Sequence, residues 1–264
     1  MSLTVDVEKR NVEKKTLACA PAGTVAFDWG HREHGHANAK EGLRAFTWLG
    51  GDGCEGEVLI PRECREALDE VDALKSRLDE TFNARKAARH LPDRNRHGYR
   101  RRLMREGVRT EEESAWLRWE MRYERRIARR RARVLDLRRE VYVRAVRELR
   151  SRYLTFAFED ESVSQLKITQ KDEQMLRRKR SNRDLATRYE FVALCERFGV
   201  DIVTVTARNS TKECPEPGCG ALLPENGPDL VVACPACGTV RDKDRGAARV
   251  ILKRAKEVLA NRAA

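Results

Sequence analysis

Two cysteine pairs near the C-terminus constrain this chain more than any other feature of its sequence. Cys214 and Cys219 form the first pair, and Cys234 and Cys237 form the second. A tetrahedral four-thiolate zinc site requires two short chelating turns that a hairpin brings together. The spacing therefore predicts a zinc ribbon. Its zinc is expected to be structural, because four thiolates leave no coordination position open.

The residues that follow the second pair carry chemistry that a zinc ribbon does not need for its own stability. Residues 241–248 read Arg-Asp-Lys-Asp-Arg-Gly-Ala-Ala and open a helix rich in small residues. We infer that the ribbon is inserted in a larger domain, and that Asp242 or Asp244 is delivered to an active site where the chain re-enters that domain. Either aspartate taken alone would most often be the N-cap of the helix.

The charge composition of the chain indicates which kind of molecule it binds. The 264 residues include 54 Lys and Arg against 42 Asp and Glu, a formal net charge of +12. Such a surplus, dominated by arginine, favours a polyanion and indicates nucleic-acid binding. No stretch approaches the length of roughly 20 apolar residues that spans a membrane, and no secretory signal is recognisable. The other cysteines, Cys19, Cys54, Cys64 and Cys195, lack pairing spacings and are expected as free thiols in a reducing cytoplasm.

Apolar alternation and turn residues predict five strands. They cover residues 24–27, 43–48, 57–60, 153–158 and 200–205. Short loops join the first three strands, so these are expected to form an antiparallel meander.

Helical periodicity predicts four helices. They cover residues 62–89, 111–150, 184–198 and 244–260. Thr110 is expected to be an N-cap and Gly199 a C-cap. The helix at 111–150 is expected to pack through an apolar stripe of Trp116, Trp119, Tyr123, Ile127, Val134, Leu137 and Val141. Its dense arginines, which include Arg126, Arg129, Arg130, Arg133, Arg138 and Arg139, form either a solvated face or, as we favour, a phosphate-tracking surface.

The element order β-β-β-α-β-α-β-α is that of an RNase H-like α/β fold with a mixed five-stranded sheet. Asp28 ends the first strand, Glu159 ends the fourth, and Asp244 begins the last helix. Parallel strands one and four would bring both strand ends to one edge of the sheet. Three carboxylates around one pocket suit Mg²⁺ or Mn²⁺, and two such ions would support in-line hydrolysis of a phosphodiester bond.

Three segments resemble the motifs of the RuvC-like nuclease domain of TnpB and the type V CRISPR effector nucleases. Residues 27–30 resemble the first motif, with its strand-borne Asp, and residues 156–160 the second, with its strand-borne Glu. Residues 234–252 resemble the zinc knuckle and third motif, which commonly reads D-x-N-A-A-x-N-I-L. The double alanine and the Ile-Leu align the catalytic aspartate with Asp244 and not with Asp242.

The resemblance implies a catalytic trio of Asp28, Glu159 and Asp244 with Mg²⁺ or Mn²⁺, and structural Zn²⁺ on the four cysteines. It also implies a DNA substrate, a guide RNA and a prokaryotic cytoplasmic protein. Arg241 and Arg245 are added to the expected nucleic-acid contacts. The N-terminal lobe with which the family holds guide RNA is expected to be a separate chain or to have been removed.

The domain organisation that follows has four parts. Residues 1–22 are expected to be an arm or junction, and residues 23–208 with 241–264 a RuvC-like nuclease domain. Within that domain, residues 62–150 form an Arg-rich helical insertion, and residues 209–240 form the ribbon. Gly246 and Val250 depart from the family, which usually has Asn at both positions, so a hydrogen bond beside the site is expected to be missing.

Other interpretations stay open at this point. Asp28 could merely end a strand before Gly30, and Glu159 could be a solvated residue of an acidic run. His31, His34 and His36 suggest a metal site, although a solvated loop explains them better. The preferred function is that of a metal-dependent DNA endonuclease domain within an RNA-guided complex. The alternatives are a nucleic-acid-binding module with weak or no cleavage and a stand-alone, structure-selective resolvase-like nuclease.

Overall fold

The computed structural model describes residues 23–29, 32–33, 42–93, 95–160, 188–223 and 231–263. Several predictions fall outside the described residues. These are the N-terminal arm at 1–22 with Cys19, the first residues of the helix expected at 184–198, and the three loop histidines, His31, His34 and His36.

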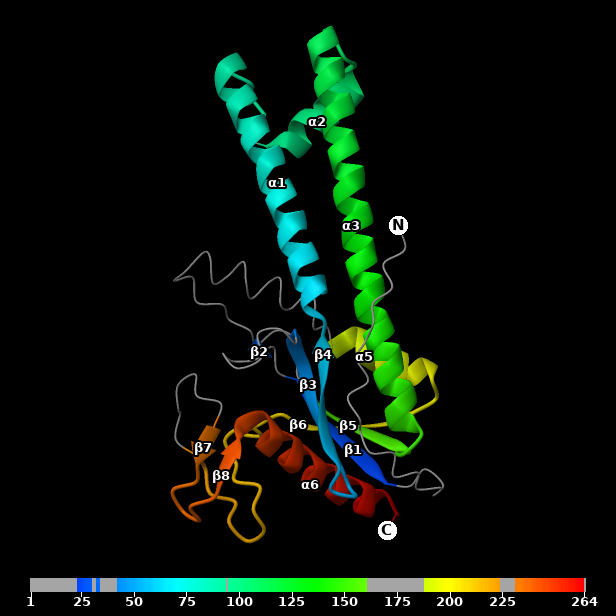
Figure 1. Cartoon of the computed structure of the whole chain (residues 1–264), viewed down its shortest axis with the longest axis vertical. Helices are drawn as coiled ribbons and strands as arrows, with labels where there is room; N and C mark the ends of the chain where they lie inside the picture. The colour runs from blue at the N-terminus through cyan, green and yellow to red at the C-terminus, as the bar shows by residue number, and fades with distance from the viewer. Residues whose placement is uncertain are drawn as a thin grey trace.

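A mixed β-sheet lies in the lower half of the view in Figure 1, below the long helices. Its five main strands are β1 (Thr24–Asp28), β3 (Leu43–Gly50), β4 (Glu55–Ile60), β5 (Thr155–Asp160) and β6 (Asp201–Thr206). β3 pairs antiparallel with both β1 and β4, while β5 pairs parallel with both β1 and β6. The predicted five-stranded RNase H-like sheet is confirmed. A sixth strand, β2 (Arg32–Glu33), was expected to be loop, because two residues are too few to show alternation.

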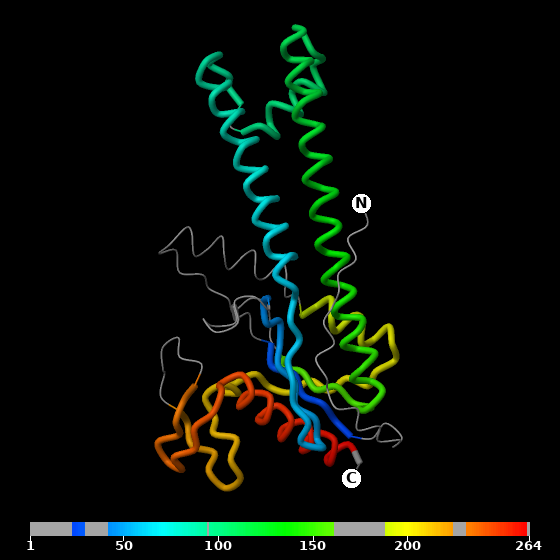
Figure 2. The backbone as a smooth tube through the Cα atoms, in the orientation of Figure 1, coloured from blue at the N-terminus to red at the C-terminus, as the bar shows by residue number. Residues whose placement is uncertain are grey.

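Helices cover both faces of this sheet, as Figures 1 and 2 show. α6 (Lys243–Ala263) packs on one face, in a cluster that includes Ala26 of β1 and Ala157 of β5. The C-terminal end of α3 (Glu111–Arg150) and α5 (Arg188–Arg197) pack on the other face. Gly199 ends the predicted helix before β6, with a positive φ of 68° that favours glycine.

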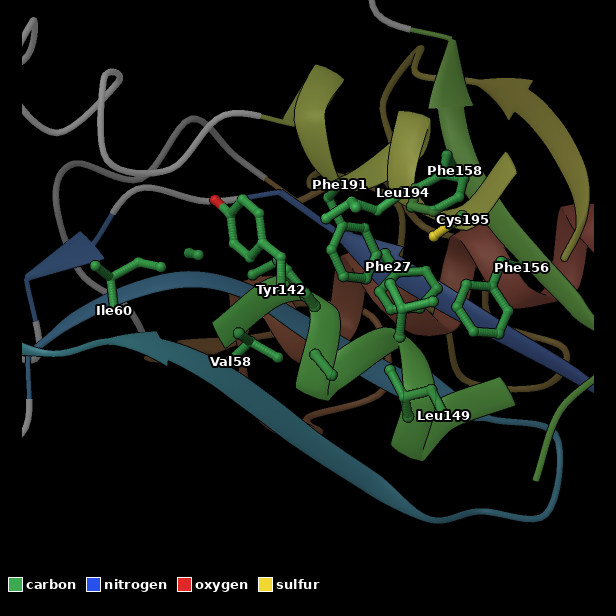
Figure 3. Close-up of a cluster of buried hydrophobic side chains, with 14 of the residues drawn as sticks. Phe27, Val58, Ile60, Tyr142, Leu149, Phe156, Phe158, Phe191, Leu194 and Cys195 are labelled. Carbon is green, nitrogen blue, oxygen red and sulfur yellow. The ribbon is translucent and has the colours of Figure 1, made fainter. Parts of the chain in front are cut away.

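A cluster of aromatic rings fills the core between the sheet and α5 (Figure 3). Phe27 of β1 lies at its centre, with ring centroids of Phe156, Phe158 and Phe191 between 4.9 and 5.4 Å away. These side chains point away from α6, because successive residues of a strand face opposite sides of the sheet. The core therefore holds β1 and β5 firmly just where the candidate carboxylates Asp28 and Glu159 follow.

Residues 62–150 project from the sheet as a long helical arm (Figure 1). α1 (Arg62–Arg89) packs along α3 through Val71, Leu74, Leu78 and Ile127. Thr110 caps α3 as expected, accepting a hydrogen bond from the backbone N–H of Glu113 at 3.1 Å. The arm also contains α2 (Arg96–Glu106), which was not predicted. Five of its eleven residues are arginine, and Tyr99 and Leu103 are its buried apolar side chains.

A buried charge cluster ties α2 to the other two helices of the arm. Glu120 of α3 is completely buried and accepts a hydrogen bond from the Arg96 guanidinium at 3.1 Å. Arg96 also contacts Asp79 of α1 at 2.6 Å and Glu124 of α3. A buried carboxylate needs such a partner, since an uncompensated charge is costly inside a protein.

The expected apolar stripe of α3 is wrong at one position. Leu137 is 38% exposed, and its neighbour Arg138 is buried instead. Arg138 forms an ion pair with Glu190 of α5 and lies over the ring of Tyr142. Arg138 therefore belongs to the contact between α3 and α5, and not to the basic face on which the sequence suggested it.

Candidate active site and zinc centre

The four predicted zinc ligands meet in one cluster. The sulfur atoms of Cys214 and Cys237 are 3.7 Å apart, as are those of Cys219 and Cys234. Thiolates around tetrahedral zinc, with Zn–S near 2.3 Å, would be about 3.8 Å apart. A disulfide would instead bring two sulfur atoms to about 2.05 Å. The cluster therefore fits a four-cysteine zinc ribbon and no disulfide.

Local backbone geometry prepares these thiols for a metal ion. Gly220 and Gly238 each follow the second cysteine of a pair and have φ of 57° and 73°, which glycine adopts without strain. The backbone N–H of Gly238 donates to the Cys234 carbonyl at 2.9 Å and closes the second turn. Hydrogen bonds from Thr239 lower the pKa of Cys237 to about 6, which favours its thiolate form.

The ribbon is fixed to α6 through Glu213, the residue before the first cysteine. Arg254 of α6 donates to the Glu213 carboxylate at 2.7 Å, and Lys253 lies 3.7 Å from it. Arg241 donates to the backbone carbonyl of Glu213 at 2.8 Å. The short hairpin of β7 (Val231–Ala233) and β8 (Val240–Asp242) then leads directly into α6. The ribbon thereby sets where the first turn of α6 begins.

Three candidate catalytic carboxylates lie on the same face of the sheet. Ala26 and Ala157 are paired in register and both pack against α6. Two residues further along each strand, Asp28 and Glu159 therefore also face α6, because strand side chains alternate. Asp244 lies in the first turn of α6 itself. All three are buried, with relative exposures of 5%, 8% and 3% respectively.

The two aspartates at the start of α6 have different roles in the structure. The Asp242 carboxylate accepts hydrogen bonds from the backbone N–H groups of Asp244 at 2.8 Å and Arg245 at 3.1 Å. Asp242 is therefore the N-cap of α6, which satisfies amide groups that have no partner within the helix. This arrangement favours Asp244 as the site carboxylate, in agreement with the alignment of the third motif.

Sequence reasoning missed the arginine that lies among these acids. Arg44 of β3 is 4% exposed and donates a hydrogen bond to the Asp244 carboxylate. Its guanidinium also lies 3.5 Å from carboxylate oxygens of Asp242 and Glu57. The sequence did offer a signal, because Arg44 is the only charged residue in a strand that is mostly apolar. Fully charged arginine is rarely buried without acidic partners.

The carboxylates of the site are not drawn into a tight cluster. Within the described part of the chain, only two groups bring three or more possible ligand atoms within 4.8 Å of one another. One is the cysteine cluster, and the other is His97 with Glu120 and Glu124. Arg96 already contacts both of these glutamates, so the second group is a structural charge cluster. The acids beside α6 offer suitable oxygen donors for Mg²⁺ or Mn²⁺, although no three of them bring ligand atoms within 4.8 Å of one another.

Gly246 fits around a neighbouring side chain. A Cβ atom on Gly246 would lie 2.9 Å from Nε and 3.1 Å from Cδ of Arg241. Arg241 is 9% exposed and is held by the Glu213 carbonyl, so its side chain has little room to move. Gly246 thus makes space for an arginine that joins the ribbon to α6.

The arginines expected to contact nucleic acid occupy unequal positions. Arg126, Arg129 and Arg133 are exposed on α3, whereas Arg130 is partly buried and pairs with Glu70 of α1. Their contact with nucleic acid stays a prediction.

The two arginines beside the ribbon also differ from each other. Arg241 is buried in the junction between ribbon and α6, a position that suits a structural role. Arg245 is half exposed at the start of α6 and lies 2.5 Å from Glu55 of β4. Arg245 can therefore be reached by a ligand beside the acidic residues, although its contact with nucleic acid is also only a prediction.

The sheet order and the inserted four-cysteine cluster define an RNase H-like domain of the RuvC type with a zinc ribbon. Residues 192–251 match the family model "Cas12f1-like, TNB domain". That segment runs from α5 through the ribbon into α6 and includes Asp244. No helix in the described part of the chain combines the length and apolarity that crossing a membrane requires.

Known proteins resemble much of the chain. The chain is 27% identical to a "CRISPR-associated DNA-binding protein Cas12m" of Allomeiothermus silvanus, over 98% of this chain and 53% of that protein. A structure of a Cas12f1-sgRNA-target DNA complex matches 86% of this chain and 49% of its own chain, with 14% identity and a TM-score of 0.42. A structure of the mini-RNA-guided endonuclease CRISPR-Cas phi3 matches 89% of this chain and 45% of its own chain, with 11% identity and a TM-score of 0.46.

The chain spans about half the length of these proteins. The family-model match and the Cas12m relative support the resemblance found in the motifs. The chain is therefore similar to the C-terminal, zinc-ribbon-containing region of TnpB and type V CRISPR effectors.

Replacement of one ligand should release the ribbon's zinc. We expect Cys234→Ser to lower the zinc content from about one ion per chain to near zero and to reduce the melting temperature, because three thiolates hold zinc less firmly. Inductively coupled plasma mass spectrometry measures the zinc. Cys54→Ser, an exposed cysteine outside the ribbon, is the control and should keep its zinc. A wild-type chain that is fully folded without zinc would contradict the structural assignment.

Gly246→Ala should have opposite effects in two backgrounds. In the wild type we expect it to lower the free energy of unfolding by about 1–3 kcal/mol, because the added Cβ collides with Arg241. In an Arg241→Ala background it should raise stability by about 0.5–1 kcal/mol, because alanine favours helix. Urea denaturation of the four chains measures this cycle. Gly98→Ala is the control, since its Cβ would meet nothing closer than 3.6 Å. Equal effects in both backgrounds would refute the packing role.

Proposed function

We propose that this chain is the nuclease domain of an RNA-guided effector and hydrolyses DNA phosphodiester bonds with divalent metal ions. The observation that carries the proposal is the burial of Asp28, Glu159 and Asp244 on one face of the sheet. Burying three carboxylates together is costly, and apolar residues would pack there at lower cost. Their oxygen atoms are the donors that Mg²⁺ and Mn²⁺ prefer.

Each carboxylate has a defined part in this proposal. Asp28 and Glu159 are held by neighbouring parallel strands, and Asp244 by the first turn of α6. Mg²⁺ or Mn²⁺ bound there would activate a water molecule and stabilise the leaving oxygen, as in the two-metal mechanism expected from the sequence. Strands fixed by the aromatic core limit how far the carboxylates can move, which favours catalysis through positioning.

The proposed partners are a DNA substrate and a guide RNA. The net charge of +12 supports a polyanionic partner. Exposed arginines on α3, namely Arg126, Arg129 and Arg133, could contact a phosphate backbone without reading its sequence. Because the chain matches 53% of its Cas12m relative, we propose that an N-terminal recognition lobe acts with it, in the same polypeptide or as a partner chain.

The proposed domain limits follow the sequence expectation. The RuvC-like domain comprises residues 23–208 and 241–264, and the ribbon comprises residues 209–240. The helices of the arm run from Arg62 to Arg150, which supports the proposed helical insertion at 62–150. The ion pairs that join Glu213 to α6 support a ribbon that is packed firmly on the nuclease domain.

One observation favours a second function, DNA binding with weak or no cleavage. Asp244 is already paired with Arg44, so one candidate ligand is engaged before any metal ion binds. The relative with 27% identity is named a DNA-binding protein. A domain of this kind would hold its target without efficient hydrolysis.

Cleavage of labelled DNA separates the two functions. With Mg²⁺ or Mn²⁺ and single- or double-stranded DNA, we expect Asp28→Ala and Glu159→Ala to lower the cleavage rate about 100-fold or more, because each removes a metal ligand. Asp136→Ala, an exposed carboxylate on α3, is the control and should cleave like the wild type.

The outcomes of this experiment test two claims separately: that the chain cleaves DNA, and that Asp28 and Glu159 belong to the site. A wild-type chain that binds DNA but cuts it with neither metal supports the DNA-binding function and rejects the nuclease. Cleavage that survives Asp28→Ala and Glu159→Ala shows that the site has been assigned to the wrong residues.

A further inference from the structure

β6 lies at one end of the sheet and leaves an edge that the described residues do not cover with a further strand. All six of its residues, Asp201–Thr206, pair in unbroken register with β5 on one side. Within the described part of the chain, no strand pairs with its other side, because the strand order of the sheet ends at β6. The backbone groups along that side are therefore available to another strand.

Alternate residues of β6 direct their backbone groups outward. The N–H of Asp201 donates to the carbonyl just before β5 at 3.3 Å, so Asp201 faces β5. Because the backbone groups of successive strand residues point to opposite sides, those of Ile202, Thr204 and Thr206 point away from β5. In agreement with this direction, Arg254 of α6 donates to the carbonyl of Thr206 at 2.6 Å. A carbonyl has two lone pairs, so this end of the edge can still accept a second hydrogen bond.

The edge lacks the features with which proteins usually prevent strand pairing. Such features are a lysine, a proline or a β-bulge. β6 reads Asp-Ile-Val-Thr-Val-Thr and contains none of them, and its register with β5 is continuous. The five residues after Asp201 are all β-branched, which favours extended backbone. A sequence of this kind on an open edge is expected to pair with another strand.

A groove lies beside the last residues of β6. It has a volume of about 550 Å³ and is bounded by β6, the turn that follows it, the ribbon and α6. Leu222 of the ribbon, 61% exposed, and Val258 of α6 supply apolar contacts. The exposed residues Arg208 and Glu257 add a charge of each sign. The Glu257 carboxylate would repel a phosphate backbone, so the groove suits polypeptide better than nucleic acid.

The two ends of β6 carry opposite charges on exposed residues. Asp201 is its first residue, and Arg208 lies two positions after its last. In an antiparallel pair of copies with Thr204 opposite Thr204, Ile202 of each copy lies opposite Thr206 of the other, so the outward backbone groups find partners. The same register places Asp201 of each copy beside Arg208 of the other. This charge pair occurs twice, because a two-fold axis relates the copies.

We propose that the β6 edge is a self-association surface, through which two copies of this chain join their sheets into one continuous sheet. The edge supplies the backbone hydrogen bonds, and the pairs of Asp201 with Arg208 fix the antiparallel register. The groove accepts the turn before β6 of the second copy. Because the interface is one short strand wide, its affinity is expected to be weak, with a dissociation constant in roughly the micromolar range. The proposal does not depend on nuclease activity, since it uses none of the candidate catalytic carboxylates.

Hydrogen exchange tests the pairing in the wild-type chain. Mass spectrometry with electron-transfer fragmentation resolves single amides in a dilute and a near-millimolar sample, and analytical ultracentrifugation gives the mass in each. We expect the mass to double, and the amides of Ile202, Thr204 and Thr206 to exchange about tenfold more slowly in the concentrated sample. The amides of Val203 and Val205 are the internal control. They face β5 already and should change little.

Charge reversal tests the register. Asp201→Arg or Arg208→Asp alone should weaken association about tenfold or more, because each brings like charges together twice across the two-fold axis. The double variant restores opposite charges and should associate nearly as the wild type does. Asp136→Arg, at an exposed residue of α3, makes the same change in charge and should leave association unchanged. Circular dichroism and zinc content establish that each variant is folded.

The outcomes that would overturn the inference do not touch the proposed function, because none of them measures cleavage. A wild-type chain that stays monomeric at near-millimolar concentration overturns it, whether or not any variant folds. So does a dimer whose β6 edge amides gain no protection, or a double variant that associates as weakly as either single variant. A DNA oligonucleotide that protects the edge amides of a monomeric chain assigns the edge to nucleic acid and also overturns the inference.

Discussion

The burial of three carboxylates against one helix is the constraint on which the rest of this structure depends. Asp28, Glu159 and Asp244 are each less than a tenth exposed. Carboxylates in such a position need cations, and the nearby chain provides one in Arg44. The parallel register of β1 and β5, the bulge in β3 and the placement of α6 all serve to bring these four groups to one face of the sheet.

The zinc ribbon contributes to the same site from outside it. Its cysteines close a hairpin whose second strand ends at Asp242, and this residue caps α6. Glu213 and Arg241 join the ribbon to the helix, and Gly246 provides the space that Arg241 occupies. The position of Asp244 thus depends on the packing of the four-cysteine ribbon against α6. Loss of zinc from the ribbon would therefore be expected to shift the first turn of α6, and with it the position of Asp244.

Local patterns in the sequence predicted the features that depend on local physics. Alternation found the five main strands, and cysteine spacing found the ribbon. The Thr110 cap followed from side-chain chemistry. Features that depend on tertiary packing were missed. The face that Arg44 takes depends on a bulge. α2 buries only two apolar side chains, Tyr99 and Leu103, beside the charge cluster around Glu120. The sequence pattern predicted that Leu137 would be buried and Arg138 exposed. The structure shows the reverse, because Arg138 pairs with Glu190 of α5.

Anomalous X-ray diffraction from crystals soaked in Mn²⁺ tests the central claim most directly. The claim is that the sheet brings Asp28 and Glu159 together as ligands of one metal site beside α6. The account predicts a manganese peak in contact with both carboxylates, on the face of the sheet that α6 covers. Manganese bound only elsewhere, or Asp28 and Glu159 pointing to opposite faces of the sheet, would contradict it.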